Sequence, residues 1–213
     1  MDLILPEVQA YAEKVTQAES PLLRRLNQDT LDHVPGYQML SGALQGAVLT
    51  MISKMVHPRA ILEIGTFTGY SAICLAEGLT EGGRLDTIDL NGDLAEMCAR
   101  YFRDAGFQEK IRQHIGAALE ILPGLKGKYD LVFIDADKVN YSRYYDLVLD
   151  KIPSGGIILA DNMLFHGEIF LPEEKLTEQA KALKEFCNKV HADKRVEQVL
   201  LTIRDGLLVI RKK

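Results

Sequence analysis

The sequence predicts an α/β fold in which a mostly parallel, seven-stranded sheet carries helices on both faces. From residue 60 onward, short β-branched runs alternate with helical segments of about 10–15 residues, as in βαβ units. Near the C-terminus, only Arg204-Asp205-Gly206 separates two further strands. So short a connection makes a hairpin, and one strand is therefore expected to run antiparallel near an edge of the sheet.

The first 55 residues are expected to form a helical cap on this sheet. Pro6 and Pro21 stand where helices begin, since proline suits the first turn of a helix. Apolar residues then recur at helical spacing between Ser41 and Met55. The predicted helices cover residues 6–18, 21–31 and 41–55. With 213 residues and no linker, the chain is expected to be one domain, 1–213, with the cap over 1–55 and the α/β core over 56–213.

The elements of the core follow in order from residue 60. The predicted strands cover residues 60–64, 84–88, 111–115, 130–134, 157–160, 196–203 and 207–211. The predicted helices cover 71–79, 94–105, a short stretch ending at 122, 141–149 and 178–191. The run Asp130–Ile134 is the most hydrophobic strand and is expected to be central. Ligands of such sheets bind beyond the carboxyl ends of the strands, so the chemistry is expected there.

Composition excludes some classes of function. Lys+Arg 25 against Asp+Glu 30 gives a net charge of -5, which argues against broad electrostatic binding to nucleic acid or anionic lipid, although a local basic patch could still bind. No apolar run approaches the roughly 18–20 residues of a membrane span, and the N-terminus lacks a signal-peptide pattern, so no membrane partner is expected. Cys74, Cys98 and Cys187 form no CxxC pair. The expected location is the cytoplasm.

A glycine turn follows the first strand, in the segment Glu63–Ser71. Its spacing is G-x-x-x-G, not the G-x-G-x-x-G of dinucleotide sites, and Glu63 would repel a pyrophosphate but attract a cation. Asp89 ends the second strand, about 20 residues after the turn, where a carboxylate can accept hydrogen bonds from ribose hydroxyls. S-adenosylmethionine carries an adenosine, a cation and a carboxylate and satisfies these demands. A tight turn with incidental acids is the alternative.

Oxygen-bearing side chains follow two neighbouring strands. Asp135 comes after the fourth strand, and Asp161 and Asn162 come after the fifth. Parallel pairing would place these three within about 5 Å across the sheet. Hard oxygen donors suit Mg²⁺ or Mn²⁺ and disfavour Zn²⁺. The acids could instead be helix caps, and Asp137 is expected to be a cap or a support behind the ligands.

Lys138 stands beside this predicted metal site. A neighbouring divalent cation disfavours the ammonium form of a lysine, which would suit Lys138 to act as a general base. An ordinary surface lysine is the alternative. His166 is a candidate for contact with the substrate, and a position on an exposed loop is the alternative.

At these residues the sequence resembles the cation-dependent O-methyltransferases of the catechol and caffeoyl-CoA type, and is closest to their bacterial branch. The resemblance runs from about Met39 to Lys213. It is carried by Glu63–Ser71 (EIGTFTGYS), Ile88–Asn91 (IDLN), Phe133–Tyr141 (FIDADKVNY), Gly155–Asn162 (GGIILADN) and Asp205–Leu207 (DGL). It implies a Rossmann-like class I methyltransferase fold and, commonly, a homodimer, for which apolar helices near residues 44–55 could supply the face.

The resemblance also implies a role for each matching residue. Lys138 would be the base, and Asp135, Asp161 and Asn162 would hold Mg²⁺, or Mn²⁺ or Ca²⁺ in its place. S-adenosylmethionine would lie against Met39, Ser41, Glu63, Gly65, Thr66, Ser71, Asp89, Ala118 and Asp135. Asp89 would hold the ribose, Ala118 the edge of the adenine, and Ser41 would lie near the methionine carboxylate.

The sequence predicts methyl transfer to one hydroxyl of a vicinal diol on an aromatic small molecule. The plant caffeoyl-CoA enzymes carry a longer, lysine-bearing N-terminal arm that has no counterpart here, and they have Asn where this chain has His166. The acceptor therefore stays open between a free catechol, a caffeoyl ester and a flavonoid. Three other functions remain as alternatives: methylation of 5-hydroxyuridine in tRNA, a nicotinamide-dependent oxidation, and a binding module without catalysis.

Overall fold

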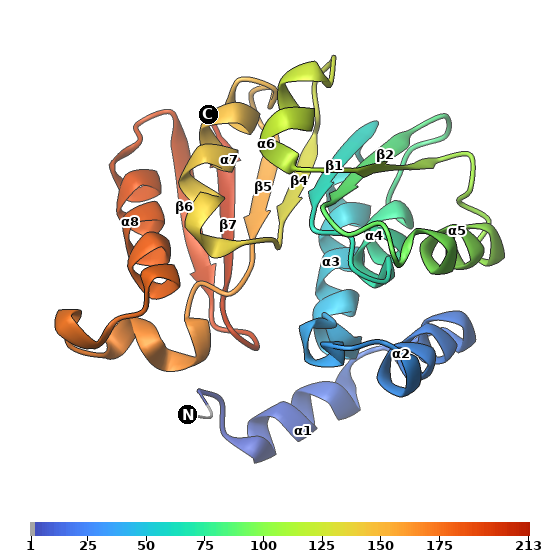
Figure 1. Cartoon of the computed structure of the whole chain (residues 1–213), viewed down its shortest axis with the longest axis horizontal. Helices are drawn as coiled ribbons and strands as arrows, with labels where there is room; N and C mark the ends of the chain where they lie inside the picture. Colours follow the sequence, from blue (N-terminus) through green and yellow to red (C-terminus); the bar gives the residue numbers. More distant parts are fainter. Residues whose placement is uncertain (1–2) are drawn as a thin grey trace.

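The computed structural model describes residues 3–213 and shows one seven-stranded sheet between two layers of helices (Figure 1). The strand order is β3-β2-β1-β4-β5-β7-β6. Within the described residues, β7 pairs antiparallel with both neighbours and all other pairs are parallel, which confirms the predicted sheet. The strands are β1 (Ala60–Ile64), β2 (Arg84–Asp89), β3 (Ile111–Ile115), β4 (Leu131–Ile134), β5 (Ile157–Ala160), β6 (Val196–Leu201) and β7 (Leu207–Lys212).

The helices lie where the sequence predicts them, with small differences at their ends. α1 ends at Val15 and not at residue 18, because Thr16 has an extended backbone. β6 likewise ends two residues before the expected Ile203. The α-helices are α1 (Pro6–Val15), α2 (Pro21–His33), α3 (Gly42–Val56), α4 (Tyr70–Ala76), α5 (Ala95–Asp104), α6 (Ala118–Ile121), α7 (Tyr141–Leu149) and α8 (Glu178–Ala192).

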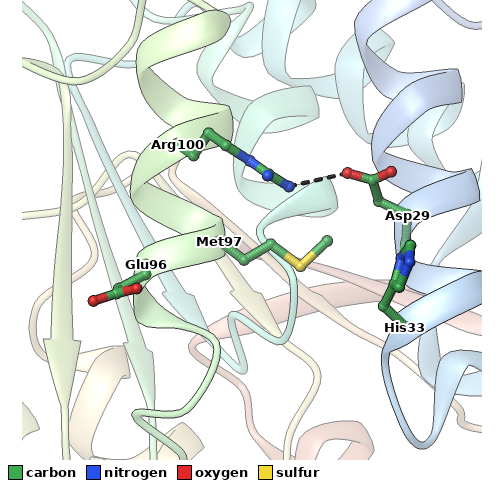
Figure 2. Close-up of a pocket in the computed structure, with 5 residues that line it drawn as sticks. All are labelled: Asp29, His33, Glu96, Met97 and Arg100. Atoms are coloured by element: carbon green, nitrogen blue, oxygen red, sulfur yellow. Dashed lines mark hydrogen bonds and ion pairs between the residues drawn. The ribbon is translucent and has the colours of Figure 1, made fainter.

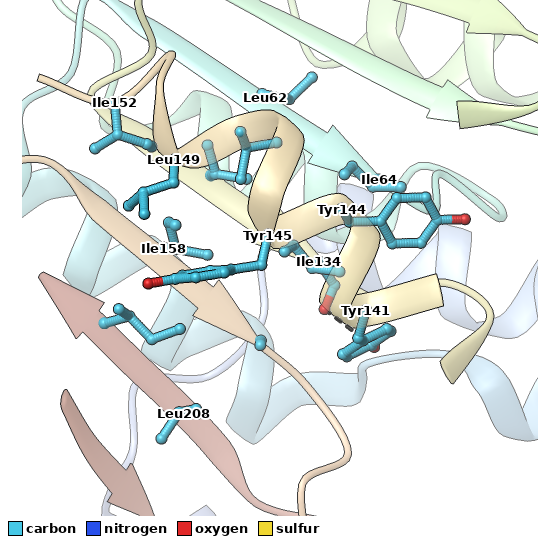
Figure 3. Packing of buried hydrophobic residues seen from close by; sticks show 14 of the residues in the cluster. Leu62, Ile64, Ile134, Tyr141, Tyr144, Tyr145, Leu149, Ile152, Ile158 and Leu208 are labelled. Atoms are coloured by element: carbon cyan, nitrogen blue, oxygen red, sulfur yellow. Dashed lines mark hydrogen bonds between the residues drawn. The ribbon is translucent and has the colours of Figure 1, made fainter. Parts of the chain in front are cut away.

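Two hydrophobic clusters fill the two faces of the sheet. α6, α7 and α8 cover one face, where Tyr141 and Tyr145 of α7 lie among strand residues (Figure 3). Both rings also pack edge-on against Phe186 of α8. α2, α3, α4 and α5 contribute to the second cluster on the other face. β4 is buried along its whole length, as expected for a central strand covered on both sides.

The register of the parallel strands aligns their carboxyl ends. Ile64 of β1 pairs with Ile134 of β4, and Ile134 pairs with Ala160 of β5. The ladder continues one residue further, since the amides of Asp135 and Asp161 donate to the carbonyls of Ile64 and Ile134 at 2.8 and 3.0 Å. This register places Gly65, Asp135 and Asp161 side by side at one edge, where the site was predicted.

The segment Tyr37–Val56 is more apolar than the sequence analysis expected. Its 20 residues include a window with a mean hydropathy of 1.3, of which 28% is buried, so by length and composition it could cross a membrane. In the structure, a short 3-10 turn (Tyr37–Met39) precedes α3, and Leu40 between them is extended. α3 has 15 residues and is about 22 Å long, against a hydrocarbon core of about 30 Å. Its buried residues, including Leu49 and Ser53, lie on the side that contacts α4.

α2 is fastened to α5 by polar contacts around a shallow surface cleft of about 570 Å³ (Figure 2). Asp29 of α2 accepts hydrogen bonds from Arg100 at 3.0 Å and from the Tyr101 hydroxyl at 2.5 Å. Met97 lies between the two helices. The cleft is thus a contact between two helices, and none of its lining residues is a predicted site residue.

Candidate active site

A cleft of about 1020 Å³ opens above the carboxyl ends of β1, β2, β4 and β5. The N-terminal segment 34–45, the turn after β1 and the loops after β4 and β5 form its walls. Eleven of the twelve predicted site residues line it, and only Glu63 does not. Those that line it are Met39, Ser41, Gly65, Thr66, Ser71, Asp89, Ala118, Asp135, Lys138, Asp161 and Asn162.

The glycine turn after β1 is shaped by the strands on either side. Gly65 has φ +104°, and a Cβ at this position would lie 1.9 Å from the carbonyl oxygen of Asp135, so the turn requires glycine there. Asp89 Oδ2 accepts the amides of Thr66 at 2.9 Å and Phe67 at 2.7 Å. Its Oδ1 accepts the amide of Asn91 at 2.9 Å. Asp89 therefore fixes the turn, and its Oδ1, which accepts one amide, keeps a lone pair for a hydroxyl in the cleft.

Glu63 lies behind the wall of the cleft and is fully buried. Its Oε2 accepts a hydrogen bond from the Thr87 hydroxyl at 2.6 Å, while Oε1 has no partner among the described residues. Burial raises the pKa of Glu63 to about 8, and hydrogen bonds from Ser71 and Thr87 offset part of that effect. A cation in the cleft would favour the ionised carboxylate of Glu63.

Asp135 follows β4, Asp161 and Asn162 follow the neighbouring β5, and all three line the cleft. Burial raises the pKa of Asp161, and the negative charge of Asp135 raises it further. A buried carboxylate whose ionisation is disfavoured by burial and by a neighbouring negative charge fits a cation placed beside it. In residues 3–213 no three His, Cys, Asp or Glu side chains are grouped for a metal, so Asn162 is needed to complete a ligand set. Two carboxylates and one amide would leave positions open for water or substrate, as Mg²⁺ sites commonly do.

Lys138 is placed beside the first of these carboxylates. Its Nζ donates to Asp135 Oδ1 and to the Tyr141 hydroxyl, both at 2.9 Å, and its side chain is 13% exposed. Tyr141 is itself buried and donates to the carbonyl of Ile134. Lys138 is therefore held at the cleft by two contacts and is not a freely moving surface lysine.

Several residues that the sequence analysis left without a role also reach this site. Gln45 of α3 is buried near Asp161 and favours its ionised form, and Arg204 donates to the Gln45 oxygen at 3.3 Å. Tyr144 donates to Asp137, which also accepts from Asn140, so Asp137 supports the loop before α7. For Gln45, a glutamine within an otherwise apolar helical pattern could have indicated a role in the sequence. The roles of Arg204, Tyr144 and Asn140 depend on tertiary contacts.

His166 lies on the rim of the cleft. Its side chain is 76% exposed, and both His166 and Phe165 have left-handed backbones, with φ +53° and +43°. His166 is thus an exposed loop residue that also borders the cleft, so a position on a loop and a contact with the substrate are compatible.

Comparison with known proteins identifies the family. The sequence model of the O-methyltransferase family matches residues 12–213. A caffeoyl-CoA O-methyltransferase from Medicago sativa is 31% identical over 205 residues, covering 91% of this chain and 83% of the relative. The methyltransferase PaMTH1 from Podospora anserina, solved with S-adenosylhomocysteine, superposes with a TM-score of 0.89 at 28% identity over 100% of both chains.

A bacterial structure gives the same result. The O-methyltransferase TomG from Streptomyces achromogenes, involved in tomaymycin synthesis and solved with S-adenosylmethionine, has a TM-score of 0.88 at 28% identity, covering 97% of this chain and 96% of its own. S-adenosylmethionine or its product is therefore bound by homologues of the same fold. The predicted fold and resemblance are confirmed: the chain belongs to the caffeoyl-CoA O-methyltransferase-like O-methyltransferases and is an S-adenosylmethionine-dependent enzyme.

Proposed function

We propose that this enzyme methylates one hydroxyl of a vicinal diol on an aromatic small molecule, in a reaction that requires a divalent cation. The observation that carries the proposal is the convergence of Asp135, Asp161 and Asn162 beside Lys138, at the edge of the same cleft as the glycine turn. The carboxylates and the amide oxygen would hold the cation. When bound, a divalent cation would orient both acceptor oxygens and acidify the one that is methylated.

Lys138 is proposed to take the proton from the reacting hydroxyl at its Nζ. Its contacts with Asp135 and Tyr141 keep Nζ in place, which favours a near-attack geometry over free rotation of the side chain. The acceptor oxygen then forms a bond to the methyl carbon of the cofactor as the bond from that carbon to sulfur breaks.

The turn after β1 and Asp89 are proposed to bind the cofactor. Asp89 would accept from the ribose, Ala118 would contact the adenine, and Ser41 would lie near the amino-acid end. S-adenosylmethionine, when bound, supplies the methyl group as a sulfonium. The chain's part is to orient that group toward the acceptor and to limit water around it.

A mass-spectrometric screen tests the proposal. Catechols, caffeoyl esters and tRNA carrying 5-hydroxyuridine are each incubated with S-adenosylmethionine, in Mg²⁺ or in EDTA. We expect a 14 Da gain on a catechol in Mg²⁺ and its loss in EDTA, restored by added Mg²⁺. Turnover that survives EDTA would contradict the metal requirement, and methylation of tRNA alone would contradict the acceptor class.

The charges of the cleft favour a small acceptor over tRNA. Six aspartates line it, against two basic residues, Lys138 and Arg204, the second of which is engaged with Leu40 and Gln45. A polyanion would meet repulsion at such a wall. The aspartates are Asp89, Asp93, Asp135, Asp137, Asp161 and Asp205.

We also propose that the enzyme is a homodimer through the outer surface of α1 and α3. No residue of α1 is buried, yet Val8, Tyr11 and Val15 form an apolar stripe that is 54%, 67% and 63% exposed. Met51 and Met55 of α3 extend the apolar surface. Exposed apolar surface of this kind is typical of an interface.

The N-terminal helices are proposed to act as part of one domain with the core. Residues 34–45 form a wall of the cleft, and Asp29 fastens α2 to α5, so the cap completes the site and does not fold apart from it.

Cys74, Cys98 and Cys187 are free thiols in the structure. Free thiols support the proposal of a cytoplasmic location, where a reducing medium keeps them so.

A further inference from the structure

The turn between β6 and β7 reaches the cleft from the far end of the sequence, at the segment Asp205–Leu207 that the sequence analysis noted without a role. The backbone of this turn is joined to the loop after β5. Met163 donates to the carbonyl of Gly206 at 3.0 Å, and Leu164 donates to the carbonyl of Asp205 at 2.8 Å. Gly206 lets the two loops approach, since a Cβ there would lie 2.7 Å from the Leu164 side chain.

The Asp205 side chain adds two hydrogen bonds to this junction. Its Oδ1 accepts the backbone amide of His166 at 2.6 Å, and its Oδ2 accepts the Asn162 side-chain amide, Nδ2, at 3.2 Å. The Asp205 side chain is 13% exposed, so most of its surface is removed from water. Because an ionised carboxylate can only accept, the NH₂ group of Asn162 must be the group that faces it.

This contact decides which end of the Asn162 amide is available to the cleft. The amide is planar, and its oxygen lies on the other side of the carbon from the nitrogen that Asp205 holds. Asn162 has a left-handed backbone, φ +65°, and follows the buried Asp161 directly, so its side chain starts from a fixed position. Without Asp205, the amide could turn its nitrogen, which cannot bind a cation, toward the carboxylates.

We propose that Asp205 is a positioning residue for the cation site: it holds the NH₂ group of Asn162 and thereby presents the amide oxygen beside Asp135 and Asp161. The inference rests on the proposed cation dependence of this enzyme. The contacts between the loop after β5 and the β6–β7 turn would then set the orientation of Asn162, one of the proposed cation ligands. Partners of this kind typically change metal affinity by 10–100-fold when removed.

The test measures Mn²⁺ affinity directly, from the electron paramagnetic resonance signal of free Mn²⁺, and S-adenosylhomocysteine affinity by calorimetry in EDTA. We expect Asp205→Ala to weaken Mn²⁺ binding 10–100-fold while changing S-adenosylhomocysteine affinity less than twofold. Asp205→Asn keeps one acceptor oxygen and is expected to lose only two- to tenfold. Asp193→Asn is the matched control, since Asp193 also clamps a loop, through Tyr145 and Arg195, away from the cleft.

The outcomes separate the inference from the proposed function. If wild-type enzyme binds no Mn²⁺, the cation dependence itself is wrong. If wild-type enzyme binds Mn²⁺ and both Asp205 variants bind it within twofold as well, Asp205 does not position the ligand. A parallel loss of Mn²⁺ and S-adenosylhomocysteine affinity would show a merely structural role. If Asp205→Ala does not fold, Asp205→Asn decides by the same limits.

Discussion

At the scale of single residues, burial controls the chemistry of the site. Glu63 is fully buried, which raises its pKa to about 8, and its Oε1 has no hydrogen-bond partner among residues 3–213. Asp161 is similarly buried and lies near Asp135. Burial therefore disfavours the ionised form of both carboxyl groups, and a positive charge nearby would stabilise that form. The buried carboxylates therefore favour binding of cationic ligands at this site.

The raised pKa of Glu63 can be tested by measuring how its replacement changes the thermal stability of the protein at different pH values. A carboxyl group whose pKa is raised on folding contributes stability that is complete below its unfolded value near 4.5 and is lost as the pH rises through about 8. Glu63→Gln cannot ionise and should escape that loss. We expect its melting temperature without ligand to exceed that of the wild type by at least about 4 °C at pH 8.5, with a smaller difference at pH 5.5. Equal differences at both pH values would contradict the assignment.

Lys138 is predicted to act in the chemical step and not in cofactor binding. Lys138→Met keeps much of the side-chain volume but removes the amine. We expect kcat to fall by about 10²–10⁴, because general bases typically contribute that much, with S-adenosylhomocysteine affinity within twofold of the wild type. Lys128→Met, on the exposed surface, serves as the control. A loss confined to cofactor affinity would remove Lys138 from its proposed role.

Removal of Asp161 tests the cation site at the same scale. Asp161→Ala deletes one of two proposed carboxylate ligands, and we expect loss of Mg²⁺-dependent turnover by at least about 10²-fold, since proximity and orientation at the acceptor are lost together. Initial rates across a Mg²⁺ titration would show it. A variant with wild-type rates at every Mg²⁺ concentration would exclude Asp161 as a ligand.

At the scale of elements, the site is made where loops from different strands meet. The turn after β1 contacts the loop after β4 so closely that Gly65 has no room for a side chain. Asp89 at the end of β2 holds the same turn from the other side. The loop after β5 is joined to the turn between β6 and β7. Each loop is thus positioned by a neighbour and not by its own sequence alone.

Gly65→Ala should show how tightly the first of these contacts is set. A Cβ 1.9 Å from the carbonyl oxygen of Asp135, at φ +104°, requires the backbone to move. We expect a loss of stability of about 3 kcal/mol or more and a melting temperature lower by at least about 6 °C. Gly124→Ala is the matched control, since nothing lies within 4 Å of its added Cβ. Equal melting temperatures for the two variants would disprove the contact.

At the scale of the whole molecule, the cap and the core form one site, and the outer face of the cap remains apolar. α1, which lies on the outside of the cap (Figure 1), carries an apolar stripe that stays exposed in the described part of the chain, and Met51 and Met55 of α3 are exposed as well. The high hydropathy of Tyr37–Val56 has the same origin, because α3 packs on α4 with one side and leaves apolar residues on the other. Association of two copies would bury this surface.

Charges in the stripe should prevent that association. We expect the wild type to sediment as a dimer and Val8→Glu/Tyr11→Glu to sediment as a monomer at micromolar concentration, because two buried charges per copy oppose the contact. Analytical ultracentrifugation measures both. Glu13→Ala, exposed on the side of α1 opposite the stripe, controls for changes in the helix. A monomeric wild type would refute the dimer.

The sequence by itself determined the sheet and most of the site. The mostly parallel sheet, its antiparallel strand near one edge and the neighbouring placement of Asp135 and Asp161 follow from the alternation of strands and helices, from the short connection before β7 and from the rule that parallel strands end together. The full strand order comes from the tertiary structure. Glu63 was expected at the cofactor but lies behind the wall, because the side chain of a strand residue points to one face and its burial depends on what covers that face. Only the tertiary structure decided the partners of the ligands. Gln45 and Asp205 come from distant segments, and no local pattern encodes a contact between side chains that are brought together by packing.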